Sequence, residues 1–365
     1  MARVWDLFCR VIDNFGDIGV CWRLACDLAE RGEEVRLWTD DPSALNWMAP
    51  QGHAGVQVLP WASAETGFDC GDVVIEAFGC DPPQAFVRRM ASRAHPPLWI
   101  NLEYLSAQRF ATQNHGMRSP QLSGPGKGLT KWFFHPGFVP GTGGLIREPD
   151  LRDRQRDFDA RAWRAAQGLS AQSGERCVSL FCYDGAGLPE LLDALARQPT
   201  LLLAAPGAAT EQLRESLGPT LRCGPLRGIA LPWLSHRDFD HLLWSCDINF
   251  VRGEDSWVRA QWASQPFVWQ PYVQSDGAHH AKLHAFLDLY LAGASAALAR
   301  DVRALWAAWN RLPGVQSAAP NALIALPEFD EWQEHQRRWR DALSAQADLT
   351  SQLMTHVSSF ANGRR

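Results

Sequence analysis

The chain has 365 residues, of which 46% are hydrophobic and 21% charged, and its 35 basic and 40 acidic residues give a formal net charge of −5. This length suggests two domains, the composition excludes disordered and fibrous proteins, and the acidic balance argues against general nucleic-acid binding. The nine cysteines include no CxxC pair, so we expect reduced thiols. No apolar run reaches the roughly 18 residues of a membrane span, and no signal peptide precedes the first strand. We therefore expect a cytoplasmic protein without a membrane segment.

The first part of the chain has the pattern of an open parallel sheet. Its residues predict a strand over 4–12, a turn over 13–19 and a helix over 20–30, because apolar residues recur there at helical spacing. Further elements are predicted as strands over 34–39, 56–61, 72–77 and 98–102, and a helix over 83–93. This order indicates a Rossmann-like first domain, residues 1–150, that ends in a long irregular segment over 106–148.

The second part of the chain starts after a polar helical segment over 151–167, which we interpret as the domain boundary. Strands are predicted over 177–183, 200–205, 220–223, 246–251 and 266–272, and helices over 188–197, 211–217, 238–244 and 279–291. They indicate a second Rossmann-like domain, residues 151–342. The amphipathic C-terminal helix, residues 343–365, is expected to pack back on the first domain.

Two doubly wound α/β domains of this kind suggest the GT-B architecture, in which two Rossmann-like domains face each other across a cleft. Ligands of open α/β sheets bind at the carboxyl ends of the strands. The stretches over 13–19 and 252–259 both follow predicted strands. We therefore expect both to contribute to a ligand site.

The stretch over 250–259 predicts a strand that turns at a glycine directly into a helix, which Asp255 or Ser256 would cap. A helix start has N–H groups without intrahelical partners and the positive end of the helix dipole. Together with Arg252 and Arg259, it would bind a phosphate or a diphosphate. A capped helix start that only carries surface charges is the open alternative.

Carboxylates accompany both stretches. Glu254 and Asp255 would repel a phosphate, so at least one of them is expected to cap the helix or to accept hydrogen bonds from sugar hydroxyls. The turn over 13–19 lacks the GxGxxG spacing of dinucleotide binders, which disfavours a nicotinamide enzyme. Its carboxylates, Asp13 and Asp17, lie beside glycines, where one of them could act as a general base, or where either could simply be a helix N-cap.

Three aromatic residues, Phe181, Tyr183 and Phe239, flank the predicted strands and helix near the anion site. They could stack on a nucleobase, and core packing is the alternative. Three histidines share a later predicted helix, namely His279, His280 and His284. Because no HExxH motif or third ligand accompanies their spacing, we predict a solvated helix face and no metal site.

Three motifs, in this order, make the chain similar to a known family. They are Asp13-Asn-Phe-Gly-Asp-Ile-Gly-Val-Cys-Trp-Arg-Leu-Ala25, Phe133-Phe-His-Pro-Gly-Phe138 before Thr142-Gly-Gly144, and Asn249-Phe-Val-Arg-Gly-Glu-Asp-Ser256 before Arg259-Ala-Gln-Trp262. Over essentially its whole length, the chain resembles the elongation factor P arginine rhamnosyltransferases. The resemblance implies an inverting GT-B transferase that moves L-rhamnose from dTDP-β-L-rhamnose to an arginine side chain of its protein partner, elongation factor P, without a metal or other cofactor.

The resemblance also implies roles for single residues. Asp17 matches the catalytic base, and Asp13 matches a supporting acidic residue. The positions that would hold the nucleotide sugar are Phe181, Tyr183, Phe239, Arg252, Glu254, Asp255 and Ser256. His236 departs from the family, which usually has Gln near the thymine, so this contact would pass through the backbone.

Two other functions remain compatible with the residues. A GT-B transferase with a lipid or sugar acceptor would need an exposed basic and apolar face, of which the first domain gives no clear sign. A non-catalytic nucleotide-binding regulator would tolerate the loss of Asp17. Modification of elongation factor P separates both from the leading hypothesis.

Overall fold

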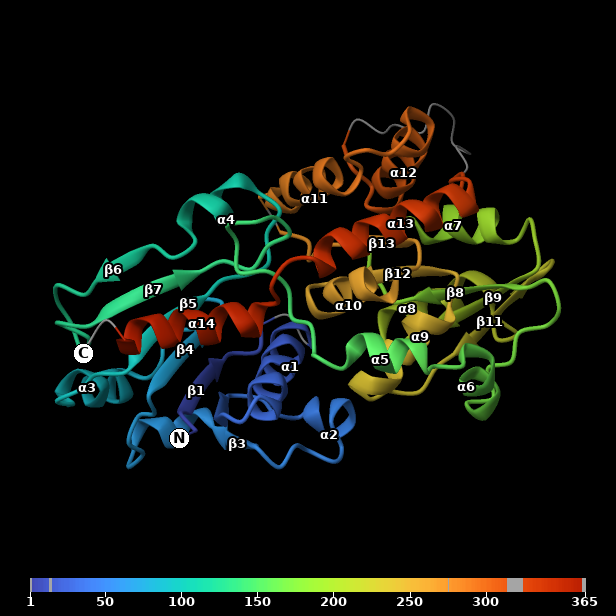
Figure 1. The fold of residues 1–365 in the computed structure, drawn as a ribbon. Coiled ribbons are helices and arrows are strands. Elements are labelled where there is room, and N and C mark those ends of the chain that lie inside the picture. The colour runs from blue at the N-terminus through green and yellow to red at the C-terminus, as the bar shows by residue number, and fades with distance from the viewer. Residues whose placement is uncertain (1, 13–14, 275, 314–323, 363–365) are drawn as a thin grey trace. The chain divides into compact units, whose positions relative to one another are not determined.

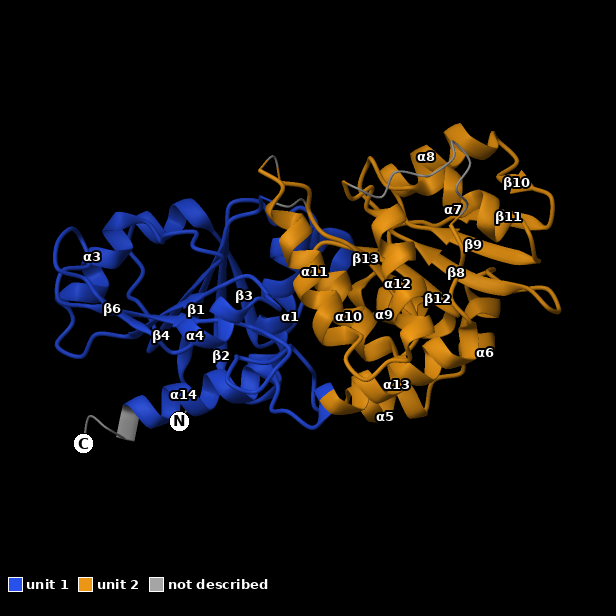
Figure 2. Cartoon of the chain, turned by 90° about the horizontal axis from the view of Figure 1, so that it is seen from above, with its two compact units in different colours: residues 1–149, 343–365 blue, residues 150–342 orange. Residues whose placement is uncertain are grey.

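A computed structural model describes residues 2–12, 15–274, 276–313 and 324–362 of the chain. Figure 1 shows its helices and strands, and Figure 2 its two compact units. Unit 1 comprises residues 1–149 and 343–365, and unit 2 comprises residues 150–342. The C-terminal segment therefore belongs to the same unit as the N-terminus.

Unit 1 is built on a seven-stranded sheet with the order β3-β2-β1-β4-β5-β7-β6, in which β6 runs antiparallel to β7 and the other pairs are parallel. The strands are β1 (Val4–Cys9), β2 (Glu34–Thr39), β3 (Val56–Pro60), β4 (Val73–Ala77), β5 (Leu98–Leu102), β6 (Arg118–Pro120) and β7 (Thr130–Phe134). The helices are α1 (Gly16–Glu30), α2 (Leu45–Met48), the 3₁₀ helix η1 (Trp61–Glu65), α3 (Gln84–Ser92), α4 (Arg109–Asn114) and α14 (Leu349–Asn362).

Helices cover both faces of this sheet, which explains why β4 and β5 are buried along their whole length. On one face, Leu24 and Leu28 of α1 and Leu353 of α14 pack with the strands in a single core. On the other face, Phe86 of α3 packs against Trp38 and other strand residues. The sheet is thus the central layer of a three-layer unit.

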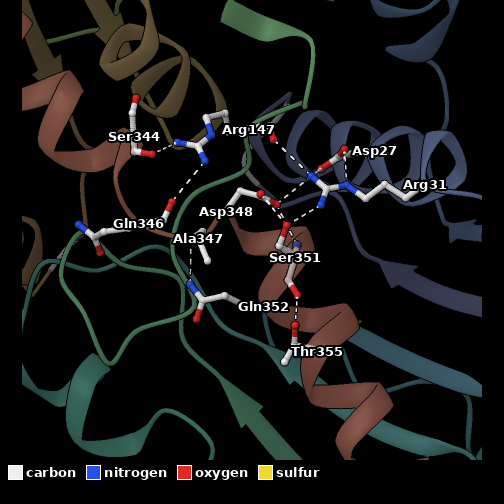
Figure 3. A network of polar contacts seen from close by, with 10 residues as sticks. All are labelled: Asp27, Arg31, Arg147, Ser344, Gln346, Ala347, Asp348, Ser351, Gln352 and Thr355. Carbon is white, nitrogen blue, oxygen red and sulfur yellow. Dashed lines mark hydrogen bonds and ion pairs between the residues drawn. The ribbon is translucent and has the colours of Figure 1, made fainter.

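A polar network ties α14 to α1 (Figure 3). The Arg31 guanidinium at the end of α1 donates to Asp348 Oδ1 at 2.8 Å, to Ser351 Oγ at 2.6 Å and to Asp27 Oδ1 at 2.9 Å. Arg147 donates to the carbonyl oxygen of Ser344 at 2.7 Å. Burial raises the pKa of Asp27, which the hydrogen bond from Arg31 opposes. These bonds fix the segment that enters α14 within unit 1.

Unit 2 has a six-stranded sheet with the order β10-β11-β9-β8-β12-β13, in which β10 is antiparallel to β11. The strands are β8 (Arg176–Leu180), β9 (Thr200–Ala204), β10 (Arg222–Cys223), β11 (Leu226–Ala230), β12 (Ile248–Arg252) and β13 (Phe267–Gln270). The helices are α5 (Leu151–Arg156), α6 (Ala160–Ala166), α7 (Leu188–Leu195), α8 (Ala208–Leu217), α9 (His236–Ser245), α10 (Asp255–Ala263), α11 (Ala278–Tyr290), α12 (Ala296–Trp309) and α13 (Phe329–Ser344).

Aromatic side chains fill much of the core of unit 2. Phe267 of β13 packs against Tyr290 of α11 and Trp306 of α12, with ring centroids 5.5 Å apart in both pairs. The Trp332 indole N–H of α13 donates to the Tyr290 hydroxyl at 3.0 Å. Many of the 17 tryptophans of the chain therefore stabilise the fold and are not available to a ligand.

Five strands of each sheet repeat one topology, which confirms the predicted pair of doubly wound, Rossmann-like domains. The two sets of strands have the spatial orders β3-β2-β1-β4-β5 and β11-β9-β8-β12-β13. In each set the chain begins at the central strand, adds the strands on one side in turn, and then crosses to add the strands on the other side. This is the arrangement of nucleotide-binding α/β sheets.

Several predicted elements of unit 1 were wrong in extent. The first strand ends at Cys9, and the first helix begins at Gly16 instead of residue 20, because the Phe15 carbonyl already accepts a bond from the Gly19 N–H. The segment over 106–148 is not irregular, since it contains α4, β6 and β7. Its many turn residues hid the apolar run of β7, which pairs with β5.

Unit 2 also departs from the prediction. The segment over 151–167 is two helices, and Asp159 caps the second by accepting from the N–H groups of Arg161 and Ala162. Strand β11 was missed because Gly228 interrupts its pattern, although a Cβ there would lie 3.0 Å from a Leu213 methyl group. The last helix begins at Leu349, because α13 extends to Ser344.

Candidate active site

The strand order reverses at one point in each sheet, and several of the predicted site residues lie at these points. The reversal falls between β1 and β4 in unit 1 and between β8 and β12 in unit 2. Connections leave such neighbouring strands toward opposite faces, so a crevice opens at their carboxyl ends. Asp17 follows β1, Phe181 and Tyr183 follow β8, and Arg252 ends β12. Each unit therefore carries a candidate site of its own.

In unit 1, Asp17 is the second residue of α1 and is only 2% exposed. Its Oδ2 accepts a hydrogen bond from the Ile12 N–H at 2.8 Å, and its Oδ1 lies 3.4 Å from the Tyr104 hydroxyl, which donates to it. A carboxylate in the first turn of a helix is also stabilised by the helix dipole. Asp13, the other predicted acidic residue, lies outside the described residues.

Two aromatic residues that the sequence pattern did not indicate lie at the same carboxyl edge of the sheet. Tyr104 is 39% exposed and stacks on Phe78, with ring centroids 4.3 Å apart and an interplanar angle of 13°. Phe78 follows β4 and has a φ of 59°, which is unusual for a residue other than glycine. The signal that could have found both is their position directly after the predicted parallel strands.

The buried thiols near Asp17 and near Arg252 are not nucleophiles. Cys21 lies one turn further along α1, and burial, then the hydrogen bond with Cys9, and also the charge of Asp17 raise its pKa. In unit 2, burial raises the pKa of Cys182 to about 12, although Arg252 opposes this. Both side chains remain protonated at neutral pH, so the chemistry of these edges depends on other groups.

In unit 2, the Arg252 guanidinium lies over two aromatic rings. Its Cζ is 4.3 Å from the ring centroid of Phe181 and 4.3 Å from that of Tyr183, and its Nη1 donates to the Cys182 carbonyl oxygen at 3.2 Å. Stacking of this kind holds a planar guanidinium in one orientation. The edge thus combines a fixed positive charge with flat aromatic surfaces.

Further rings extend this surface on both sides. Phe239 of α9 contacts the Phe181 ring edge to face, with centroids 5.8 Å apart, and it also packs against the core that contains Leu203 and Leu242. Tyr272, which the sequence pattern did not indicate, contacts the Tyr183 ring with centroids 5.7 Å apart and is 50% exposed. Tyr272 follows β13. The side-chain oxygen of Gln270, the last residue of this strand, accepts from the Tyr183 N–H at 2.8 Å and so positions Tyr183.

The start of α10 differs in detail from the prediction. Glu254 is the N-cap residue and Asp255 is the first helical residue, so the predicted cap by Asp255 or Ser256 was wrong. The Ser256 hydroxyl accepts from the Arg252 N–H at 3.1 Å and donates to the Arg252 carbonyl oxygen. His236 Nε2 lies 4.0 Å from Asp255 Oδ2. Ser256 therefore fixes the turn, and the amides of the first turn are the groups suited to an anion.

Arg259 is not part of the anion site, contrary to the prediction. It is 1% exposed, and its Nε and Nη2 donate to the two carboxylate oxygens of Asp240 at 2.8 and 2.6 Å. A buried charge cannot leave such a partner without a large desolvation cost. Arg259 holds α10 to α9, which leaves Arg252 as the arginine of the site.

The described residues contain no group of three or more His, Cys, Asp or Glu side chains that could hold a metal ion. Of the three histidines of α11, His279 is buried and accepts a hydrogen bond from the Gln274 N–H through Nδ1 at 3.2 Å, so the prediction of a solvated helix face was wrong for this residue. Across the ranges 2–12, 15–274, 276–313 and 324–362, no helix is both long and apolar enough to cross a bilayer.

The two edges offer different chemistry. The edge of unit 2 combines the positive charge of Arg252 with flat aromatic rings. The edge of unit 1 presents an oriented carboxylate that can accept a proton.

Known proteins resemble this chain along its whole length. The family model described as "Elongation-Factor P (EF-P) rhamnosyltransferase EarP" matches residues 5–358. A protein-arginine rhamnosyltransferase of Pseudomonas aeruginosa is 43% identical over 98% of this chain and 99% of its own. A solved structure from work on the structural basis for EarP-mediated arginine glycosylation of translation elongation factor EF-P has a TM-score of 0.68 at 32% identity and covers 98% of this chain and 99% of that chain.

More distant structures support the fold. The calicheamicin glycosyltransferase has a TM-score of 0.52 at 16% identity, with coverage of 99% of this chain and 98% of that chain. At this identity the likeness concerns the fold alone. With the two doubly wound sheets, it confirms the predicted GT-B fold.

Proposed function

Since the chain belongs to the EarP family of elongation factor P rhamnosyltransferases and is thus a protein-arginine glycosyltransferase, we propose that it moves L-rhamnose from dTDP-β-L-rhamnose to an arginine of elongation factor P with inversion at the anomeric carbon. The reaction takes place in the cytoplasm, where the factor serves translation. The nucleotide sugar is a substrate, and no further cofactor is part of the proposal.

The observation that carries the donor assignment is the position of Arg252 over Phe181 and Tyr183 at the switch point of unit 2. In this assignment the aromatic group formed by Phe181, Tyr183 and Phe239 receives the thymine ring. Arg252 and the first-turn amides of α10 receive the diphosphate.

The acidic residues and His236 complete the donor assignment. Glu254 and Asp255 accept hydrogen bonds from hydroxyls of the rhamnose, which removes the conflict between carboxylates and a phosphate site. Asp255 lies 4.0 Å from His236, so a change in one of these side chains affects the other. His236 stands where the family usually has Gln, and its backbone makes the contact with thymine.

The acceptor needs activation because a guanidinium is a poor nucleophile. Its pKa is above about 12 and its lone pairs are delocalised. Asp17 would orient the guanidinium and accept one proton as a nitrogen lone pair attacks the anomeric carbon. Asp13 would support Asp17 as a second carboxylate.

A single displacement balances this reaction and inverts the anomeric carbon. The C–N bond forms while the bond from the anomeric carbon to the diphosphate oxygen breaks, and dTDP leaves with the electron pair. Arg252 and the helix start would stabilise the negative charge that develops on the diphosphate. These groups supply the positive charge that a metal ion supplies in other transferases.

The test is an intact-mass measurement of elongation factor P after incubation with the enzyme and dTDP-β-L-rhamnose. We expect a gain of one deoxyhexose, which fragmentation maps to an arginine. Transfer to a sugar or lipid instead would favour a GT-B enzyme with another acceptor. Binding of dTDP without any transfer would favour a non-catalytic regulator.

The stereochemistry needs its own measurement. NMR of the modified arginine gives the anomeric configuration of the linked rhamnose, which we expect to be α. Retention of the β configuration would contradict a single displacement.

A further inference from the structure

We propose that Tyr104 is a positioning residue that orients the carboxylate of Asp17 for proton transfer from the acceptor guanidinium. This inference rests on the proposed function, in which Asp17 is the base. Tyr104 lies in unit 1, 87 positions further along the chain than Asp17, and its hydroxyl donates to Asp17 Oδ1.

The two carboxylate oxygens of Asp17 are held differently. Oδ2 accepts from the Ile12 N–H at 2.8 Å, the usual length of a good hydrogen bond. Oδ1 is 3.4 Å from the Tyr104 oxygen, which is long for an O–H···O bond. Hydrogen bonds of catalytic groups are often long without substrate and shorten in the reactive complex. Of these two bonds, the one to Oδ1 is the longer, and Tyr104 is the group that directs this oxygen.

Tyr104 itself is held by the ends of two strands. Its ring stacks on Phe78 at 4.3 Å, and the Phe78 N–H donates to the carbonyl oxygen of Leu102, the last residue of β5, at 2.6 Å. The positive φ of Phe78, 59°, costs conformational energy, and such residues cluster at functional sites. Phe78 therefore packs its ring against the tyrosine whose hydroxyl donates to Asp17.

The chemistry of a phenol suits this role. At neutral pH a phenol is a hydrogen-bond donor, so it stabilises the ionised carboxylate that must accept the proton. The Cys21 thiol also faces Asp17 from α1, and it stays protonated because burial raises its pKa. Tyr104 thus favours the ionised form of the base and fixes its direction, without contact to the reacting atoms.

The experiment compares the pH dependence of kcat for wild type and Tyr104→Phe, with elongation factor P and dTDP-β-L-rhamnose at saturation. We expect kcat to fall about tenfold, as for loss of a hydrogen bond to a charged group. The acidic limb of the profile moves to higher pH, because the carboxylate is protonated more readily without its donor. The KM for elongation factor P and the affinity for dTDP stay unchanged.

Two further variants separate positioning from a general structural effect. Phe78→Asn keeps the left-handed backbone accessible but removes the stacked ring, so it should shift the acidic limb in the same direction by less. Tyr290→Phe is the matched control, because it removes a buried phenol oxygen from unit 2, where that oxygen accepts from Trp332. The acidic limb of this control stays in place.

An unmoved acidic limb in Tyr104→Phe would overturn the inference, whether or not kcat falls. The proposed function fails separately: if Asp17→Asn retains full transfer, Asp17 is not the base. Loss of transfer in Asp17→Asn with an unchanged profile in Tyr104→Phe would leave the base assignment standing and remove Tyr104 alone.

Discussion

The switch points of the two sheets have the same topology but different side chains. Between β1 and β4 of unit 1, the edge presents a buried carboxylate, Asp17, with a tyrosine hydroxyl donating to it. Between β8 and β12 of unit 2, the edge presents a guanidinium, Arg252, over two aromatic rings. The fold thus determines where a site can form, and the residues that follow the strands determine its chemistry.

The difference assigns one function to each unit in the proposed reaction. Cationic and aromatic groups suit a nucleoside diphosphate, and an oriented carboxylate suits a proton in transfer. If this division holds, substitutions at the edge of unit 1 change turnover without affecting the affinity for dTDP. Substitutions at the edge of unit 2 lower this affinity first.

The largest effect is expected for Asp17→Asn, which keeps the shape of the side chain but cannot accept the proton. Loss of a general base lowers kcat by about 10²–10⁴-fold. Calorimetry should give an unchanged affinity for dTDP, since the proposed nucleotide site is on unit 2. Asp69→Asn, at an exposed position of unit 1, is the control and should keep wild-type turnover. Weaker dTDP binding by Asp17→Asn would break the division between the units.

The second prediction concerns Arg259, to which we assign a structural role, in contrast to Arg252 at the candidate site. Arg259→Met leaves Asp240 buried without its bidentate partner, and the loss of one partner of a buried ion pair costs about 3–5 kcal/mol of stability. Urea denaturation followed by circular dichroism should show the loss. The double variant with Asp240→Leu should be more stable than Arg259→Met alone, because no charge then remains buried. Equal stability of Arg259→Met and wild type would contradict the structural role.

The third prediction concerns Arg252, the arginine that we assign to the diphosphate. Charge-assisted hydrogen bonds contribute about 1.5–3 kcal/mol, so Arg252→Ala should weaken dTDP binding by about this amount. Arg252→Lys should recover part of the loss, because the charge returns but the planar stacking does not. Arg222→Ala, at the exposed edge strand β10, is the control for a lost positive charge in unit 2. Undiminished dTDP binding by Arg252→Ala would remove Arg252 from the donor site.

The sequence alone indicated the strand, turn and helix at the end of β12 more readily than the pairing of Asp17 with Tyr104, for a physical reason. Arg252 and the start of α10 form a local strand-turn-helix signal within ten residues. Tyr104 and Asp17 are 87 positions apart, and no local pattern shows that two strand ends bring them together. Arg259 was misassigned because its partner comes from another helix.

The same distinction explains the errors in the fold. Apolar periodicity was sufficient for strands over 34–39 and 98–102, whose predicted bounds are those of β2 and β5. It failed for β11, where a Cβ on Gly228 would lie 3.0 Å from a Leu213 methyl group, so a side chain fits there only if its neighbours shift. Tertiary packing, which a local pattern does not contain, decides such positions.

The smallest effect is expected for the dependence of protein stability on pH. It concerns the packing of α14 on unit 1 and not the two candidate sites. His356 of α14 packs on the Trp132 ring at 5.1 Å, and burial lowers its pKa. The unfolded chain, in which a histidine has a pKa of about 6.5, then binds a proton more readily than the folded chain. Stability is therefore complete above about pH 6.5 and falls as the pH decreases, by at most about 1.4 kcal/mol per pH unit for one histidine. Urea denaturation at several pH values should show this loss in wild type and a smaller one in His356→Phe. His95→Phe, at an exposed position, is the control and should retain the wild-type slope. Equal slopes in all three proteins would show that His356 does not couple pH to the stability of unit 1.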